Sequence, residues 1–402
     1  MISIEVLRDC LKRYDCFYLY DENTITESVA RLKENFPQVK FLYSIKCNSN
    51  PHVLRAVFAQ GLGADAASAG EVAMAREAGL SEDEIYYSAP GKSIEDIKNT
   101  MDKATLIADS LDEIKRIQSL AEQAGSMVKI GIRINPDFSF AGDVGQPSKF
   151  GIDEEQAVSF LRRTPCKNVK ISGIHVHLKS QELNMDTLAS YYRRMLALSE
   201  KFDSLCDGLD YINMGSGMGV PYAPGDIPLD VESLGTAVQR EIGKYKAAHP
   251  NTKIIIEVGR YAVCESGIYV TKVMDRKISH GKTYLILKNT LNGFLRPSLA
   301  RLVASYSEEA LPCGSEPLFT SKDAFKIRVM KEGPASETVT LAGNLCTGTD
   351  VIAEDILLPR LECGDAVIIT NAGSYAAVLS PIQFSSQEKP VELFLRQSGV
   401  IA

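Results

Sequence analysis

Apolar and polar positions follow a repeating pattern over the first 260 or so residues. Short runs of β-branched and apolar residues are followed by stretches with the spacing of amphipathic helices. We read strands over residues 39–46, 63–68, 84–90, 104–110, 128–135, 171–178, 211–217 and 253–259. Helical patterns lie between them, for example over residues 51–61, 70–79, 111–125, 185–203 and 231–249. Eight strands alternating with helices over about 220 residues predict a closed (β/α)8 barrel, with an open doubly wound sheet as the alternative.

The pattern changes after Arg260 to strands separated by turn residues, with few helical stretches. We read these strands over residues 268–279, 282–289, 337–343 and 365–371. A further strand over residues 16–20 precedes the barrel and is expected to complete the same sheet. The predicted fold is therefore α/β. It has a barrel domain over residues 24–263 and a β-rich, sandwich- or barrel-like domain from residues 1–23 and 264–402.

Composition narrows the classes of protein. The 402 residues are 45% hydrophobic and 24% charged, as in a globular protein, and the formal net charge of −7 argues against a nucleic-acid surface. No apolar run reaches the roughly 18 residues of a membrane helix, and no signal peptide is apparent. The nine cysteines form no CxxC pairs, which favours reduced thiols. We expect a cytoplasmic protein that binds neither nucleic acid nor membrane.

Lys46 is the first candidate for chemistry, because barrel active sites lie at the carboxyl ends of the strands. It ends the first apolar run. Most lysines are only solvated surface charges. A lysine beside a buried strand is partly desolvated, which lowers its pKa and favours imine formation.

His175 and His177 lie near the end of the sixth run, two residues apart, so that a strand would present both rings on one face. Such a pair can bind a metal. A metal needs more ligands, and no carboxylate-rich motif accompanies the pair, so we predict no metal. We favour one histidine lying flat on an aromatic cofactor, with a hydrogen-bonded core histidine as the simpler alternative.

Polar segments also end the last two strands. Residues 215–219, Gly-Ser-Gly-Met-Gly, follow the seventh run, where barrel phosphate sites often form, although a simple turn has the same composition. Glu257 and Arg260 end the eighth run. The two charges could pair with each other, but a phosphate is a better partner for the arginine, which would leave Glu257 facing the barrel centre.

Together these segments supply an amine, an aromatic ring, a phosphate cradle and a carboxylate. Pyridoxal 5'-phosphate requires this set: a lysine that binds it covalently, a ring contact, a phosphate site and an acid for the pyridine nitrogen. The sequence therefore predicts pyridoxal phosphate as the cofactor.

The same segments resemble, in order and over nearly the whole chain, the fold-type III pyridoxal-phosphate decarboxylases, which include the diaminopimelate and ornithine decarboxylases. The barrel motifs are residues 43–48 (YSIKCN) with Lys46, residues 64–68 (ADAAS) with Asp65 and then Glu71, Arg133, residues 149–151 (KFG), His177 and Ser180. The later motifs are Gly215, Ser216 and Gly217, then Glu257, Gly259 and Arg260, Cys346 and Asp350, and Tyr375.

The resemblance implies an alanine racemase-like barrel and a function for each of these residues. Lys46, His177, Glu257 and Cys346 are the implied catalytic residues. The implied cofactor-binding residues are Lys46, Asp65, Arg133, His177, Ser180, Gly215, Ser216, Gly217, Glu257, Gly259, Arg260 and Tyr375. The family also implies a head-to-tail homodimer with shared active sites, in which Cys346 reaches the partner's site and is the candidate general acid; a buried structural thiol is the alternative.

Four positions depart from the family motifs. Lys179 replaces a glycine after His177, Ser216 replaces the middle glycine, and Val258 replaces a proline. Thr347 stands where diaminopimelate and ornithine decarboxylases carry an acid that binds a distal amine.

A threonine cannot pair with an ammonium group, so the chain is most similar to the subgroup from siderophore and aminoglycoside pathways. Those enzymes decarboxylate an amino acid already joined to a larger group. Arg296, followed by proline, resembles the arginine that binds a substrate carboxylate in diaminopimelate decarboxylases. Arg296, Thr347 and Asp350 are therefore the expected substrate-binding residues.

Other functions stay open at this stage. Diaminopimelate decarboxylation is the first alternative. An amino-acid racemase on the same barrel is disfavoured because such enzymes place an arginine, not Glu257, opposite the pyridine nitrogen. A catalytically inactive regulatory homologue is disfavoured by the presence of Lys46 and Cys346. A metal hydrolase on a barrel comes last.

Overall fold

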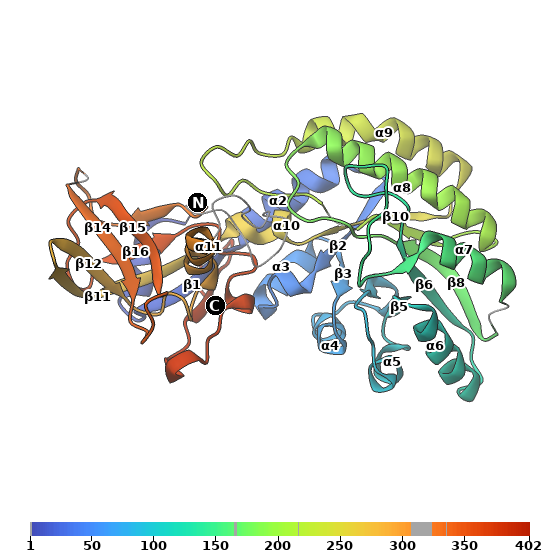
Figure 1. Cartoon of the computed structure of the whole chain (residues 1–402), viewed down its shortest axis with the longest axis horizontal. Coiled ribbons are helices and arrows are strands. Elements are labelled where there is room, and N and C mark those ends of the chain that lie inside the picture. Colours follow the sequence, from blue (N-terminus) through green and yellow to red (C-terminus); the bar gives the residue numbers. More distant parts are fainter. Residues whose placement is uncertain (1, 165–166, 216, 307–323, 335) are drawn as a thin grey trace. The chain divides into compact units, whose positions relative to one another are not determined.

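The computed structural model describes residues 2–164, 167–215, 217–306, 324–334 and 336–402. The chain forms two compact units (Figure 1). The barrel unit consists of Val29–Gly219 and Leu229–Gly259. The β-rich unit consists of Met1–Ser28, Val220–Pro228 and Arg260–Ala402, so the 220–228 segment belongs with a unit that is remote from it in sequence.

The barrel unit contains a closed ring of parallel strands. They are β2 (Val39–Ser44), β3 (Gly63–Ala66), β4 (Ile85–Tyr87), β5 (Thr105–Ala108), β6 (Val128–Asn135), β8 (Val169–His175), β9 (Tyr211–Asn213) and β10 (Lys253–Val258). The two-residue β7 (Ile152–Asp153) lies outside this ring and pairs in parallel with the end of β6. Pairing of β10 with β2 and of β5 with β6 closes the ring. The barrel prediction is therefore confirmed, and the open doubly wound sheet is wrong.

Helices follow most of the strands. They are α2 (Glu22–Asn35), α3 (Pro51–Ala59), α4 (Ala69–Glu77), α5 (Ile94–Thr100), α6 (Leu111–Gln123), α7 (Glu154–Arg163), α8 (Met185–Leu205) and α9 (Val231–Ala248). Several begin at a side chain that accepts a hydrogen bond from the first turn, such as Ser68, Ser110, Asn184 and Asp230. These caps satisfy amide groups that have no partner inside the helix, which fixes where each helix starts.

Side chains fill the interior of the barrel. Leu42, Tyr86, Ile107, Tyr211 and Ile255 form one buried cluster there. The Tyr211 side chain occupies the space beside Gly131 on β6 and Gly173 on β8. A Cβ at Gly131 would lie 2.1 Å from the Tyr211 hydroxyl oxygen, and one at Gly173 would lie 2.3 Å from the Tyr211 ring. The packed interior leaves the strand ends as the place for chemistry.

Several predicted strand ends lie a few residues too late, and two of them concern candidate site residues. The first strand was expected to reach Lys46, but β2 ends at Ser44 and Lys46 lies in the 3-10 turn η1 (Ile45–Cys47). The sixth was expected to reach residue 178, but β8 ends at His175, so His177 lies in the following loop. The apolar run continues in both places because Ile45 and Cys47 after β2, and Val176 after β8, are also buried.

The β-rich unit is built on one mixed sheet. Its strands are β1 (Cys16–Asp21), β11 (Gly267–Ser279), β12 (Lys282–Leu287), β13 (Ile327–Val329), β14 (Glu337–Gly343), β15 (Val351–Leu358), β16 (Ala366–Ile369) and β17 (Val391–Leu395). Its helices are α1 (Ile4–Leu11), α10 (Arg260–Val263) and α11 (Leu295–Tyr306). As predicted, β1 joins this sheet, antiparallel to β11 and parallel to β17.

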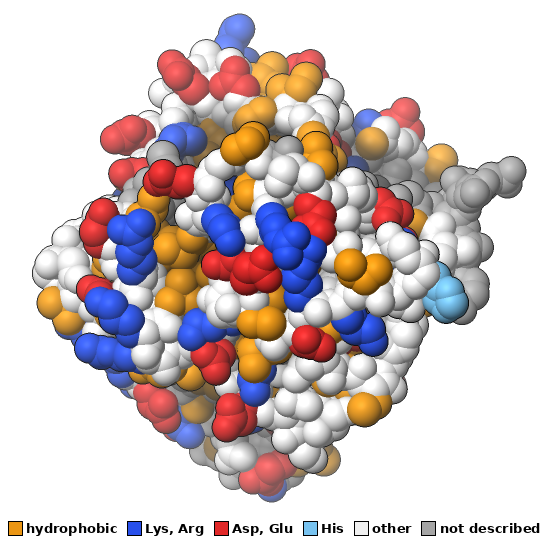
Figure 2. Space-filling view, turned by 90° about the vertical axis from the view of Figure 1, so that its left-hand side faces the viewer, with side chains coloured by type: hydrophobic (Ala, Val, Ile, Leu, Met, Phe, Trp, Pro, Cys, Tyr) orange, Lys and Arg blue, Asp and Glu red, His pale blue; other side chains and the backbone are white. Residues whose placement is uncertain are grey.

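The surface of the molecule carries interspersed charges on the face shown in Figure 2, where Lys and Arg side chains alternate with Asp and Glu. Ion pairs of the β-rich unit include Lys331 with Asp365 at 3.1 Å and Lys282 with Asp355 at 3.3 Å. Among the described residues, no helix has the length and apolarity that crossing a bilayer requires.

Candidate active site

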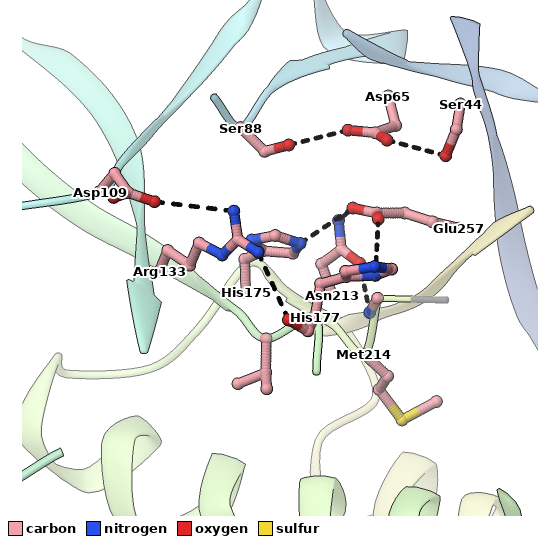
Figure 3. Close-up of polar contacts among 12 residues, drawn as sticks. Ser44, Asp65, Ser88, Asp109, Arg133, His175, His177, Asn213, Met214 and Glu257 are labelled. Atoms are coloured by element: carbon pink, nitrogen blue, oxygen red, sulfur yellow. Dashed lines mark hydrogen bonds and ion pairs between the residues drawn. The ribbon is translucent and has the colours of Figure 1, made fainter. Parts of the chain in front are cut away.

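Lys46 and Asp65 form an ion pair at the carboxyl ends of β2 and β3. The Lys46 Nζ lies 2.8 Å from Asp65 Oδ2, and 38% of the lysine side chain is exposed. Asp65 is fully buried, and the hydroxyls of Ser44 and Ser88 each donate to it at 2.8 Å (Figure 3). The carboxylate is thus fixed from three sides, and it holds an amine that is still accessible.

Glu257 is the centre of a second cluster, drawn in Figure 3. One carboxylate oxygen accepts a hydrogen bond from Asn213 Nδ2 at 2.9 Å and lies 3.0 Å from His175 Nε2. The other lies 3.7 Å from His177 Nδ1. Both histidines therefore face one carboxylate, as expected if their rings share one side of the chain.

The charges in this cluster are set by burial and by the neighbouring groups. Burial alone would raise the pKa of Glu257, but the adjacent His175 imidazole and the Lys46 ammonium group hold that pKa well below its ordinary value. Burial lowers the pKa of His177 to about 4, against the opposing pull of Glu257. At neutral pH the site thus combines an ionised carboxylate with a neutral imidazole. In the part of the chain that the structure describes, no group of three or more His, Cys, Asp or Glu residues is placed to hold a metal ion.

Arg133 links β6 to the loop that carries His177. Its Nη2 donates to the His177 carbonyl oxygen at 3.4 Å, and its Nη1 lies 3.7 Å from Asp109. Phe150, from the KFG motif, lies against the guanidinium, 4.4 Å from ring centroid to Cζ. The arginine therefore helps to place the backbone of His177.

An ion pair within the segment after His177 stabilises that segment. Lys179, which departs from the family glycine, pairs with Glu182 at 2.8 Å. Gln181 has a φ of +61°, which turns the chain after the half-buried Ser180.

The glycine segment after β9 needs its glycines for close packing. Gly215 has a φ of +66°, and a Cβ there would lie 2.2 Å from the Val176 carbonyl oxygen. A Cβ on Gly217 would lie 2.7 Å from Leu188 Cδ2. The Gly215 N–H donates to Asn213 Oδ1 at 2.9 Å. Ser216, predicted to bind the cofactor, lies outside the described residues.

Arg260 and Arg296 converge on one hydroxyl in the β-rich unit. Their Nη1 atoms donate to the Tyr222 oxygen at 3.0 and 3.3 Å. The Tyr375 ring centroid lies 5.0 Å from the Arg260 Cζ, at a residue with a φ of +51°. Both arginines are buried, and the Nε and Nη2 of each have no hydrogen-bond partner among the described residues. Buried donors without acceptors fit an anionic ligand.

The loop before β15 carries the remaining predicted residues. Cys346 is exposed, and the Thr347 hydroxyl lies 2.9 Å from that of Thr349. Asp350 is buried and accepts hydrogen bonds from the N–H groups of Leu291 at 2.9 Å and Leu345 at 3.1 Å. Its carboxylate therefore joins two loops, and its contact with a substrate stays a prediction.

Several polar residues of these clusters escaped the sequence analysis. In the barrel unit they are Ser44, Ser88, Asp109 and Asn213, each a polar residue at or near the end of an apolar run. That position was a usable signal, because a buried polar side chain at a strand end needs a partner. Tyr222 lies in a loop between Pro221 and Ala223 and had no such signal.

The residues present fit pyridoxal phosphate. An accessible amine, an ionised buried carboxylate and a neutral imidazole meet at the barrel strand ends. In the β-rich unit, the Nε and Nη2 groups of the two buried arginines have no acceptor among the described residues. The barrel groups match the carbonyl carbon, the pyridine nitrogen and the aromatic ring of the cofactor, and donors of the kind that the arginines offer suit a phosphate.

Comparisons with known proteins agree with this chemistry. The family model for the pyridoxal-binding domain of pyridoxal-dependent decarboxylases matches residues 22–264. An L-glutamyl-[BtrI acyl-carrier protein] decarboxylase of Niallia circulans is 32% identical, covering 96% of this chain and 90% of the relative. A diaminopimelate decarboxylase of Helicobacter pylori is 28% identical over 96% of this chain and 91% of that enzyme.

A solved structure extends the likeness to three dimensions. The crystal structure of diaminopimelate decarboxylase from Helicobacter pylori complexed with L-lysine is similar with a TM-score of 0.82 and 26% identity, covering 98% of this chain and 95% of that one. Fold, site chemistry and sequence likeness thus point to one family. The chain belongs to the fold-type III pyridoxal-dependent decarboxylases and is an amino-acid decarboxylase that uses pyridoxal phosphate.

Proposed function

We propose that this decarboxylase acts on an α-amino acid whose side-chain end is already joined to a carrier, with an aminoacyl thioester on a carrier protein as the best candidate. The relative from Niallia circulans, named for an L-glutamyl-[acyl-carrier protein] substrate, supports this class. A conjugate of the kind used in siderophore pathways is the closest variant. The enzyme would be a cytoplasmic homodimer with shared active sites.

Thr347 is the observation that carries the proposal. A free diamino acid presents a distal ammonium group, which needs a carboxylate partner inside a site. Thr347 offers only a hydroxyl, and that hydroxyl already lies 2.9 Å from Thr349 Oγ1. The nearby Asp350 carboxylate is engaged by Leu291 and Leu345. The loop therefore suits a neutral thioester or amide better than a cation.

The cofactor's part in the reaction is to accept the electron pair released when the bond between Cα and the carboxylate breaks. Lys46 would bind the cofactor covalently. The Asp65 carboxylate, which lies 2.8 Å from the Lys46 amine, would accept a hydrogen bond from the protonated nitrogen next to the reacting carbon. Glu257, kept ionised by its neighbours, would accept a hydrogen bond from the pyridine N–H and keep that nitrogen protonated. His177, neutral at pH 7, would lie against the ring.

The remaining residues would bind the phosphate and the substrate. Arg260 has buried N–H groups free to hold the phosphate, and Arg296 has the same groups free for a carboxylate or carbonyl oxygen of the substrate. Cys346 is exposed, as a residue that serves the partner's site should be. It would deliver a proton to Cα after CO2 has left.

A substrate panel tests the proposal. CO2 release would be measured with glutamyl thioester on a carrier protein, a citryl-diaminopropionate conjugate, meso-diaminopimelate, ornithine and free glutamate. We expect the thioester to give a kcat/KM at least about 100-fold above that of any free amino acid. Preference for the citryl conjugate would identify the siderophore variant.

Diaminopimelate decarboxylation is the second candidate, supported by the 28% identical relative. Rapid turnover of meso-diaminopimelate would overturn the conjugate proposal. Thr347→Glu tests the role of this position directly, because it introduces the acid that diaminopimelate decarboxylases carry there. If Thr347 excludes the distal amine, this variant should gain activity on diaminopimelate and lose activity on the thioester.

A further inference from the structure

We propose that Asn213 is a positioning residue that ties Glu257 to the glycine segment at Gly215, so that one amide group sets both the pyridine-nitrogen and the phosphate ends of the cofactor site. The inference rests on the cofactor roles of these two partners given above. It does not depend on which amino acid or conjugate the enzyme decarboxylates.

Asn213 is the last residue of β9 and is fully buried. Its Nδ2 donates to Glu257 Oε1 at 2.9 Å, and its Oδ1 accepts the Gly215 N–H at 2.9 Å (Figure 3). Both are good hydrogen-bond lengths. The Asn213 side chain therefore connects Glu257 on β10 with Gly215, in the segment that follows β9.

The partners dictate which way the amide points. Glu257 is ionised, so it can only accept, and the atom that faces it must be the NH2 group. A backbone N–H can only donate, so the atom facing Gly215 must be the oxygen. Aspartate has the shape but lacks the donor, and leucine lacks both functions. Asparagine is the residue of this size that satisfies both partners.

The glycine segment needs such a support, because glycines have no side chain with which to hold themselves in place. Gly215 adopts a φ of +66° and also accepts, through its carbonyl, the Glu257 N–H at 2.8 Å. Glu257 and Gly215 are thus joined twice, once directly by backbone and once through the Asn213 side chain. Loss of the amide would leave the backbone contact but free the carboxylate to rotate.

The surroundings of Glu257 show why rotation matters. His175 lies 3.0 Å from the oxygen that Asn213 holds, and His177 lies 3.7 Å from the other. A turned carboxylate would exchange these partners and lose its alignment with a ring nitrogen. We therefore expect Asn213 to control both the affinity for the cofactor and the protonation state of the bound pyridine.

The test uses Asn213→Ala and Asn213→Asp in the full-length enzyme, with pyridoxal phosphate as the probe. The apparent dissociation constant would be measured by titrating cofactor-free protein, together with the absorbance of the bound cofactor as a function of pH. Removing a hydrogen bond to a charged group should weaken binding about tenfold or more in Asn213→Ala. Asn213→Asp keeps the Gly215 contact but places a second carboxylate beside Glu257, so it should also weaken binding and, because the two acids would then share a proton, shift the pH dependence of the spectrum.

Thr252→Ala is the matched control. Thr252 is buried at the opposite end of the barrel, just before β10, and donates to the Leu209 carbonyl oxygen at 2.7 Å. Its loss should lower the melting temperature without changing cofactor affinity or spectrum. If Asn213 had a purely structural role, its variants would likewise lower only the melting temperature. Wild-type affinity and spectrum in both Asn213 variants would therefore overturn the proposal. If Asn213→Ala does not fold, the spectrum of Asn213→Asp decides.

Discussion

The two polar clusters of the molecule differ in how their charged groups are satisfied. In the barrel unit, Asp65 binds Lys46 and two serine hydroxyls, and Glu257 has Asn213 and His175 as partners. In the β-rich unit, Arg260 and Arg296 share one tyrosine oxygen and leave buried N–H groups without acceptors among the described residues.

This difference separates two ways of building a site. The barrel holds its charges with its own side chains, so that its geometry and protonation are fixed before any ligand binds. The arginine cluster has donors to spare, and an anion that bound there would supply the missing acceptors. The largest effect on the enzyme is expected where the barrel amine itself is removed.

Lys46→Ala should abolish covalent binding of the cofactor and reduce kcat by more than about 1,000-fold, because the variant lacks the amine that forms the covalent link. Turnover and the absorbance of the lysine-bound cofactor are the measurements. Lys46→Arg is the control, because it keeps a cation beside Asp65 but cannot form the covalent link. Full activity in either variant would contradict the assignment of Lys46.

Arg260→Met should weaken cofactor binding about 30-fold, because a buried charged hydrogen-bond donor to phosphate is worth about 2 kcal/mol. Inorganic phosphate should raise the melting temperature of the cofactor-free wild type but not of this variant. Lys331→Met is the control, since Lys331 belongs to the same unit and is already paired with Asp365. Equal stabilisation of Arg260→Met by phosphate would show that the cluster is not the anion site.

The fold could be predicted from the sequence, but the hydrogen-bond partners within the two polar clusters could not. The barrel strands could be located because residues such as Ile254, Ile255 and Ile256 form continuous apolar runs, which parallel strands buried on both faces require. Lys46 was found, but its 3-10 turn was not, because nothing in the sequence marks Ser44 as the last strand residue.

The bridging residues could not have been paired from sequence. Asn213 and Glu257 are 44 residues apart, and Tyr222 and Arg296 are 74 apart. Spacing carries no information at such distances, because only barrel closure and sheet packing bring the partners together. Motif resemblance identified Arg260 and Arg296 separately, but their common acceptor, Tyr222, became visible only in three dimensions.

The smallest effect concerns His177, where the barrel's preset charges can be tested without any cofactor. Burial lowers the pKa of His177 from 6.5 to about 4 in the folded protein. The unfolded chain therefore takes up this proton first, so stability is complete above about pH 6.5 and falls as the pH drops toward 4. His177→Gln should remove the contribution of this imidazole to the pH dependence of unfolding. Between pH 7 and pH 5 the free energy of unfolding should therefore fall by about 1–2 kcal/mol less in this variant than in the wild type. Urea unfolding of the cofactor-free proteins measures it, with His249→Gln, a histidine paired with Glu200 at 2.9 Å, as the control. Identical pH dependence in His177→Gln and wild type would mean that the fold does not hold the imidazole neutral, and that the barrel cluster acquires this protonation state only when its ligand binds.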